Sequence, residues 1–354
     1  MNQAIIRTLN DPQLLAVREK HIERLTRIYD GEQPDSPFVY AGYAAKATAD
    51  PTTEPEKWVE ESLTDLYEHA ELAADEQVFR PLCAYHWFYG VHFTDKVFGA
   101  HVRANGDQWW SDGVENEIGE LPAPDLEKNE TWKMVQRFTL AQVEAGVKLP
   151  IYTTQVLGEP WNQFFNIYHD RALYGFYDDP DGMKRDLAIV TDTLVEMHKW
   201  FLKTIPADQF QPVLPEARFQ PRGCGQMCGC ATHLISHDIY EEFIREQDER
   251  IAQLYPRGLM LHLCGAHTQH LDSWRDMPGI RAFQLNDRAM DDVGAFYHKS
   301  REDQFIHHWS TPNMPITKCL ELTEGGNRSL FTLWHLELDA KRPLSFEESI
   351  KLGL

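Results

Sequence analysis

Two side chains that could bind a metal ion lie two residues apart in the segment Leu261-His262-Leu263-Cys264-Gly265. The leucines predict a buried strand, and alternate side chains of a strand point to the same face. We therefore expect His262 and Cys264 on one face and the strand to end at Gly265. An imidazole and a thiolate are two of the ligands that zinc prefers. The segment predicts a metal site, and the structural alternative is a buried histidine beside a small hydrophobic cysteine.

A zinc site needs at least one further protein ligand, and the chain offers several. His335 lies near the end of the predicted last strand, SLFTLWHLE, and is the preferred third ligand. Cys319 falls in a predicted helix, which is a less suitable position. The loop PRGCGQMCGC carries Cys224, Cys228 and Cys230, but it lacks the paired CxxC spacing of common zinc sites. We interpret this loop as free thiols near the site, with Cys228 or Cys230 as alternative third ligands.

Other polar and aromatic side chains are expected near the ends of strands. Asp287 follows the predicted strand IRAFQLND, and the next predicted strand, QFIHHWSTP, contains His307 and His308. Alternation along a strand sends only one of these two histidines inward. Asp287 and His308 are the candidate catalytic residues. The candidate substrate-binding residues are His86, Tyr152 of the Tyr152-Thr153 pair, and Trp334.

Short β-rich runs alternate with helix-patterned segments along most of the chain, which is typical of βα units around a parallel sheet. Four such units follow one another from residue 258. Four strand candidates lie upstream, in SPFVYAGYA, VFRPLCAYHWFY, VKLPIYTTQV and the Pro-rich FQPVLPEARFQPRG. Eight units predict an α/β fold of the (β/α)8 TIM-barrel type, with an open doubly wound sheet as the alternative. Functional side chains of such a barrel lie where the strands end, at its C-terminal face.

The same alternation suggests one main domain. A helical arm is expected over residues 1–34 and a single barrel over residues 35–354. Residues 90–125 interrupt the rhythm with a hairpin-like insertion, whose turn is predicted at Asn105-Gly106.

The composition narrows the class of protein. The 354-residue chain has 55 acidic and 34 basic side chains and a formal net charge of −21. We expect neither nucleic acid nor an anionic membrane as the main partner, because both would repel this charge. The N-terminus lacks the apolar core of a signal peptide, and no apolar run approaches the roughly 20 residues of a membrane helix. Six cysteines are too few for a disulfide framework, so we expect a cytoplasmic protein.

Three segments resemble the uroporphyrinogen decarboxylase superfamily, within a resemblance that covers residues 35–354. They are SHDIYEEFIREQDERIAQLYPRGLMLHLCGAHTQHLDSW, ALYGFYDDPDGMKRDLAIVTDTLVEM and LWHLELDAKRPLSFEESIKL. The resemblance implies a (β/α)8 barrel with its active site at the strand C-termini. The motifs are closest to the zinc-dependent corrinoid methyltransferases, in which a His-x-Cys pair and a distant C-terminal cysteine hold zinc. His262 and Cys264 match the pair, whereas the last predicted strand ends near His335 instead of a cysteine.

This resemblance implies a zinc-dependent methyltransferase. It would move a methyl group between methylcobalamin, supplied by a corrinoid protein, and a thiol or small methylated compound. The alternative is a metal-independent decarboxylase or lyase for a carboxylated substrate, but SPFVYAGYAAKATAD lacks the arginine-rich pattern of the decarboxylases. A third hypothesis is a non-catalytic barrel that binds a corrinoid or tetrapyrrole. A homodimer is compatible with each of these hypotheses.

Overall fold

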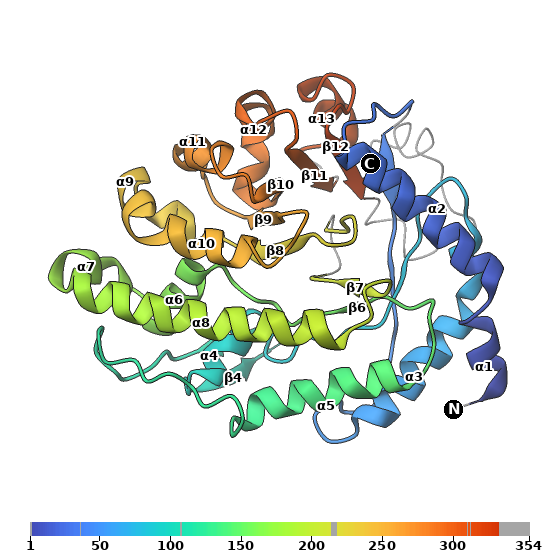
Figure 1. Ribbon diagram of the computed structural model, residues 1–354, viewed down its shortest axis with the longest axis horizontal. Coiled ribbons are helices and arrows are strands. Elements are labelled where there is room, and N and C mark those ends of the chain that lie inside the picture. The colour runs from blue at the N-terminus through green and yellow to red at the C-terminus, as the bar shows by residue number, and fades with distance from the viewer. Residues whose placement is uncertain are drawn as a thin grey trace.

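A computed structural model describes residues 2–35, 37–106, 108–213, 218–309, 311 and 313–332, and the structural statements that follow concern these residues. Strands occupy the centre of the molecule and helices form a layer around them (Figure 1). Over the described part of the chain, no helix combines the length and the apolar character that crossing a membrane would require.

The main sheet contains six parallel strands in the order β1-β12-β11-β10-β9-β8. Their bounds are β1 Phe38–Tyr40, β8 Gly225–Cys228, β9 Leu259–Leu263, β10 Ile280–Leu285, β11 Phe305–Trp309 and β12 Ser329–Thr332. Two short parallel pairs lie beside this sheet. They are β2 (Tyr43–Ala44) with β3 (Leu82–Cys83), and β6 (Tyr152–Thr153) with β7 (Phe210–Gln211).

Single parallel bridges connect these pairs to the main sheet and to each other. The bridges are Tyr40–Phe79, Cys83–Ile151 and Gly158–Cys228. They extend the strand order from β1 through β3 and β6 back to β8, which closes the ring. The predicted α/β barrel is therefore confirmed.

The region between residues 210 and 230 differs from the prediction. The Pro-rich stretch provides only the two-residue strand β7, whereas the expected cysteine loop contains β8, whose four residues are all buried. A Cβ atom at Gly225 would lie 2.3 Å from the Tyr255 ring, so glycine allows this strand to pack closely against the Tyr255 side chain. The sequence GQMC has no β-branched or aromatic residue, which is why a strand was not expected there.

The helices follow the strands as βα units require. Their bounds are α1 Gln3–Thr8, α2 Pro12–Tyr29, α3 Pro55–Glu68, α4 Phe93–Val97, α5 Glu130–Glu144, α6 Pro160–Tyr168, α7 Arg171–Asp178, α8 Pro180–Thr204, α9 His237–Ile239, α10 Arg245–Ala252, α11 Leu271–Arg275, α12 Val293–Lys299 and α13 Ile316–Leu322. A π-helical turn, Tyr240–Ile244, joins α9 to α10. Asp179 caps α8 by accepting a hydrogen bond from the Gly182 N–H, and Pro180 occupies its first turn.

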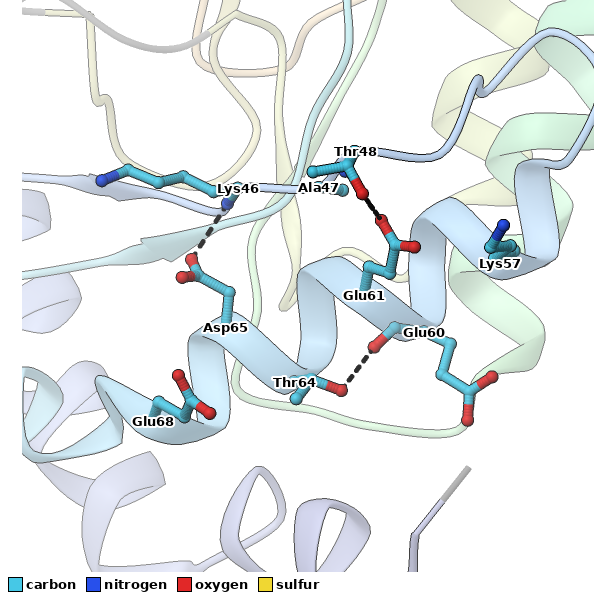
Figure 2. Close-up of a pocket in the computed structure, with 9 residues that line it drawn as sticks. All are labelled: Lys46, Ala47, Thr48, Lys57, Glu60, Glu61, Thr64, Asp65 and Glu68. Carbon is cyan, nitrogen blue, oxygen red and sulfur yellow. Dashed lines mark hydrogen bonds between the residues drawn. The ribbon is translucent and has the colours of Figure 1, made fainter.

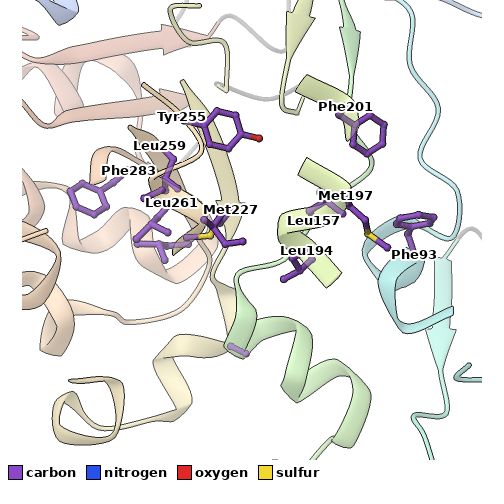
Figure 3. Close-up of a cluster of buried hydrophobic side chains, with 14 of the residues drawn as sticks. Phe93, Leu157, Leu194, Met197, Phe201, Met227, Tyr255, Leu259, Leu261 and Phe283 are labelled. Carbon is purple, nitrogen blue, oxygen red and sulfur yellow. The ribbon is translucent and has the colours of Figure 1, made fainter. Parts of the chain in front are cut away.

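The hydrophobic core has an outer layer between the strands and the helices. Leu194, Met197 and Phe201 of α8 share this layer with Leu259 and Leu261 of β9 (Figure 3). Each of these side chains is fully buried, which contributes roughly 1.5–3 kcal/mol per residue.

A second hydrophobic cluster fills the interior of the barrel. Inward-facing side chains near the start of the strands, such as Met260 and Phe305, pack against α2. Tyr29 of α2 stacks on Phe305 with ring centroids 4.3 Å apart, and its hydroxyl lies 2.6 Å from His307 Nε2. The helix α2 therefore covers the N-terminal end of the barrel, so a functional site is expected at the C-terminal end.

The predicted hairpin is present in the insertion between β3 and α5. Strands β4 (Val102–Asn105) and β5 (Gln108–Ser111) pair antiparallel, with Asn105 opposite Gln108. Trp109 and Trp110 on β5 are partly exposed.

Candidate metal centre

Four possible metal ligands meet at the C-terminal ends of β8 and β9. The two strands are parallel neighbours, and Cys228 pairs directly with His262. The Sγ atoms of Cys228 and Cys230 are 3.6 Å apart, and Cys230 Sγ lies 3.1 Å from Cys264 Sγ. Cys264 Sγ in turn lies 3.2 Å from His262 Nε2. The ligand atoms of Cys228, Cys230 and His262 all lie within 4.8 Å of one another, so these three residues form a candidate metal site.

Hydrogen bonding sets the orientation of the His262 ring. Its Nδ1 is hydrogen-bonded to Gln284 Oε1, and because an amide oxygen only accepts, Nδ1 carries the proton. The lone pair of Nε2 is then directed to the cysteines, as a metal-binding histidine requires. Burial, followed by the nearby Arg218 guanidinium, lowers the pKa of His262 and favours the neutral ring that binds metals. Arg218 Nη2 lies 3.2 Å from His262 Nδ1.

The two closest thiols have different acidities. A hydrogen bond from the Cys230 thiol lowers the pKa of Cys264 to about 6. The pKa of Cys230 is raised because it hydrogen-bonds to Cys228 and Cys264. Cys264 is therefore the more acidic thiol of the pair.

The structure brings together only some of the ligands considered from the sequence. His262 and Cys264 face one another as expected, and Cys228 and Cys230 join them. Cys319 is elsewhere, fully buried on α13, where burial raises its pKa to about 12. His335 and the candidate substrate-binding residue Trp334 lie outside the described residues.

The two candidate catalytic residues lie in different surroundings. His308 is buried and its ring packs edge-on against Phe331, on the outward side of β11. Burial lowers the pKa of His308 to about 4. Asp287 is exposed, in a loop whose Ala289 N–H donates to the Cys264 carbonyl. Its φ of +44° is rare for a residue with a side chain.

A cavity of about 280 Å³ lies beside Asp287, between the loops that follow β10 and β11. Met290 and Met314 also line it. Asn286, Asp287 and Arg288 line one side of this cavity, and the Ala289 N–H of the same loop donates to the Cys264 carbonyl.

The candidate substrate-binding residues His86 and Tyr152 contribute to the outer core. The His86 ring lies 4.8 Å from Phe88 and 6.2 Å from Trp58, and Tyr152 is buried in the same layer. Tyr85, one residue before His86, packs against the interior cluster instead. At this strand end the side chain that faces the interior is therefore Tyr85, whereas His86 packs in the outer core.

A second surface groove, of about 600 Å³, lies between residues 46–48 and α3 (Figure 2). Two acidic side chains in this groove accept hydrogen bonds from the main chain. Glu61 accepts from the Thr48 N–H, and Asp65 accepts from the Lys46 N–H. The hydrogen bonds from Thr48 lower the pKa of Glu61. These carboxylates fix the loop after β2 and do not form part of the cysteine cluster.

Sequence reasoning missed two polar residues of the site. Gln284 and Arg218 both contact His262. Gln284 could have been found, because it precedes the end of β10 by one residue and pairs with His262 in the sheet. Arg218 belongs to the segment between β7 and β8, whose path no periodicity in the sequence indicates.

Comparison with known proteins gives information about the fold. No protein-family model and no curated protein sequence matches the chain. Among solved structures, a methyltransferase from Methanosarcina mazei is similar with a TM-score of 0.58 and 14% identity, over 94% of this chain and 96% of that one. A B12-independent methionine synthase from Shewanella sp. W3-18-1, in complex with selenomethionine, gives a TM-score of 0.41 and 10% identity over 90% and 96%. The likeness to the Methanosarcina enzyme agrees with the α/β barrel described above.

Proposed function

We propose that the protein is a zinc-dependent methyltransferase whose metal is held by Cys228, Cys230 and His262, with Cys264 beside them. The observation that carries this proposal is the convergence of thiols and a correctly oriented imidazole at the C-terminal end of a barrel. The fold is also similar to that of the Methanosarcina methyltransferase. The reaction would move a methyl group between a corrinoid protein and a thiol or small methylated compound.

The donor set fits zinc. Thiolates and imidazole are its usual nitrogen and sulfur ligands, and three protein ligands leave a fourth position for a substrate. The Nδ1–H of His262 is already bound by Gln284, which leaves Nε2 to bind the metal. When bound, zinc supplies Lewis acidity that lowers the pKa of a coordinated thiol, so that the thiolate exists at neutral pH.

The residues of the chain have separate roles in this reaction. Gln284 holds the imidazole of His262, and the Asn286–Ala289 loop, which lines the cavity beside Asp287, is hydrogen-bonded to the Cys264 main chain. We assign the substrate to this cavity. A methylcobalamin carrier would supply the methyl group. A thiol bound in the cavity would give its proton to solvent and form the S–C bond, and the electron pair of the broken Co–C bond would stay with the carrier.

Metal content tests the proposal, with His262→Ala as the variant because it removes the imidazole donor of the proposed ligand set. We expect about one zinc ion per chain in protein purified without added metal, and a loss of most of this zinc in the variant. Cys319→Ala is the matched control, since Cys319 is a buried thiol outside the cluster, and it should retain zinc.

Activity is measured with free methylcobalamin and a panel of thiols, by the change in the corrinoid absorption spectrum. Chelator-treated protein should be inactive and recover on addition of zinc. Equal zinc content in wild type and His262→Ala, or full activity after chelation, would refute the proposal.

A further inference from the structure

The first turn of α6 holds the loop that carries two of the proposed ligands. This loop, residues 228–232, includes Cys228 and Cys230, and α6 is the next helix after β6 in the chain. Glu159 is the N-cap residue of α6 and is completely buried. Burying a carboxyl group is costly unless its hydrogen bonds are made within the protein. The proposed methyl transfer gives Glu159 no role.

Glu159 contacts the loop at three points. Its N–H donates to the Cys228 carbonyl at 3.0 Å. The Thr232 hydroxyl donates to its carboxyl oxygens at 2.6 and 2.9 Å. A Cβ atom built on Gly229 would lie only 2.5 Å from Glu159 Oε2, so the carboxyl group rests against the Gly229 backbone. The side chain therefore fills the space behind the residue that separates the two cysteines.

The two cysteines are held differently. Cys228 is the last residue of β8 and is fixed by its pairing with His262 on β9. Cys230 lies beyond the strand, between Gly229 and Ala231. The Gly229 N–H donates to the His262 carbonyl at 2.9 Å, and the Ala231 N–H donates to Asn162 Oδ1 at 2.8 Å.

Loss of the Glu159 side chain would consequently affect Cys230 much more than Cys228. The hydrogen bond from the Glu159 main chain to Cys228 survives any substitution except proline. The contacts with Gly229 and Thr232 belong to the side chain and would disappear. They flank Cys230, whose Sγ is the atom that reaches Cys264 at 3.1 Å.

We propose that Glu159 is a positioning residue of the metal centre, which fixes Cys230 for metal binding through its contacts with Gly229 and Thr232. This inference rests on the metal site of the proposed function. Groups that orient metal ligands in this way typically contribute 10–100-fold to metal affinity.

Cobalt(II) binding tests the inference, because thiolate-to-cobalt absorption reports the thiolates bound to the metal. We expect Glu159→Ala to bind Co²⁺ about 10–100-fold more weakly than wild type. It should also lose the share of the charge-transfer band that Cys230→Ala removes. Because both substitutions act on one ligand, the double variant should have the spectrum of Cys230→Ala alone.

Glu159→Gln supplies the rescue. Glutamine keeps the size of the side chain and an oxygen that can accept from Thr232, so the wild-type spectrum and affinity should return. Asp186→Ala is the control for general destabilisation, because Asp186 is also fully buried and also holds a loop, by accepting from the Gly119 N–H. It should lower the melting temperature and leave the cobalt spectrum unchanged.

A wild-type spectrum and affinity in Glu159→Ala would overturn the inference, as would failure of Glu159→Gln to restore them. If Glu159→Ala does not fold, Thr232→Val decides, since it removes the same hydrogen bond from the loop side and should give the same spectral loss. Absence of Co²⁺ binding in the wild type would instead refute the metal site itself, so the two failures are distinguishable.

Discussion

Replacing Gln284 with leucine should weaken zinc binding without unfolding the protein. Gln284 is fully buried on β10, directly beside His262 on β9, and its Oε1 accepts the Nδ1 hydrogen bond of that ring. Leucine has a similar size but no acceptor. The substitution would leave the Nδ1–H unsatisfied in a buried position and would free the ring to turn away from the cysteines.

The loss of zinc affinity in Gln284→Leu can be worked out in two ways. Loss of a group that orients a metal ligand typically costs 10–100-fold in affinity, which corresponds to about 1.4–2.8 kcal/mol. A buried hydrogen-bonding group left without a partner costs about 1–3 kcal/mol. The two ranges overlap, so we expect the Kd for zinc to rise by one to two orders of magnitude in Gln284→Leu.

Competition with a chromophoric chelator at pH 7.5 measures this Kd, and thermal melting followed by circular dichroism measures stability. Gln142→Leu is the matched control. Gln142 is also buried, and it donates from Nε2 to the Ala84 carbonyl at 2.8 Å, away from the cysteine cluster. Its loss should lower the melting temperature and leave the zinc Kd unchanged. A zinc Kd for Gln284→Leu within twofold of wild type, in folded protein, would show that His262 is not a ligand or is not oriented by Gln284.

Two further predictions concern stability and thiol reactivity. Leu261→Ala removes a fully buried side chain of β9 and should lower the free energy of unfolding by about 2–5 kcal/mol, measured by urea denaturation; a loss below about 1 kcal/mol would contradict the tight packing of the outer layer. In chelator-treated protein at pH 7, iodoacetamide should alkylate Cys264 before Cys319, because their pKa values are about 6 and about 12 and only the thiolate reacts. The rate at Cys264 should fall as the pH drops through 6, and peptide mass spectrometry that finds equal rates at the two cysteines would contradict the assigned acidities.

The sequence predicted the part of the site that depends on local periodicity. His262 and Cys264 sit in a run of leucines, and alternation alone places them on one face. The same reasoning succeeded for the barrel, because each βα unit repeats a local pattern. It gave the wrong strand in residues 210–230, since β8 lacks residues with strand preference and is held by packing of Gly225 against Tyr255.

The hydrophobic periodicity of the sequence could not reveal residues whose role depends on tertiary contacts. Glu159 lies at the start of a helix and looks like an ordinary N-terminal acidic residue, yet it is buried against a loop about 70 residues away in the chain. His86 shows a related difficulty, because the inward-facing side of an irregular strand end depends on where pairing stops. There the interior side chain is Tyr85.

The cluster itself follows from one property of the sheet that links the two short motifs. In the parallel pairing of β8 with β9, Cys228 is opposite His262, an offset of 34 residues. The contact between Cys230 and Cys264 has the same offset. Two ligand pairs, each with one intervening residue, therefore lie in register at the ends of neighbouring strands. The strands place Cys228 and His262, and the residues just beyond them carry Cys230 and Cys264. Because side chains alternate along a strand, a shift of one residue in this register would turn Cys228 away from His262. The assignment of the metal site thus depends on the β8–β9 register as much as on the identity of the ligands.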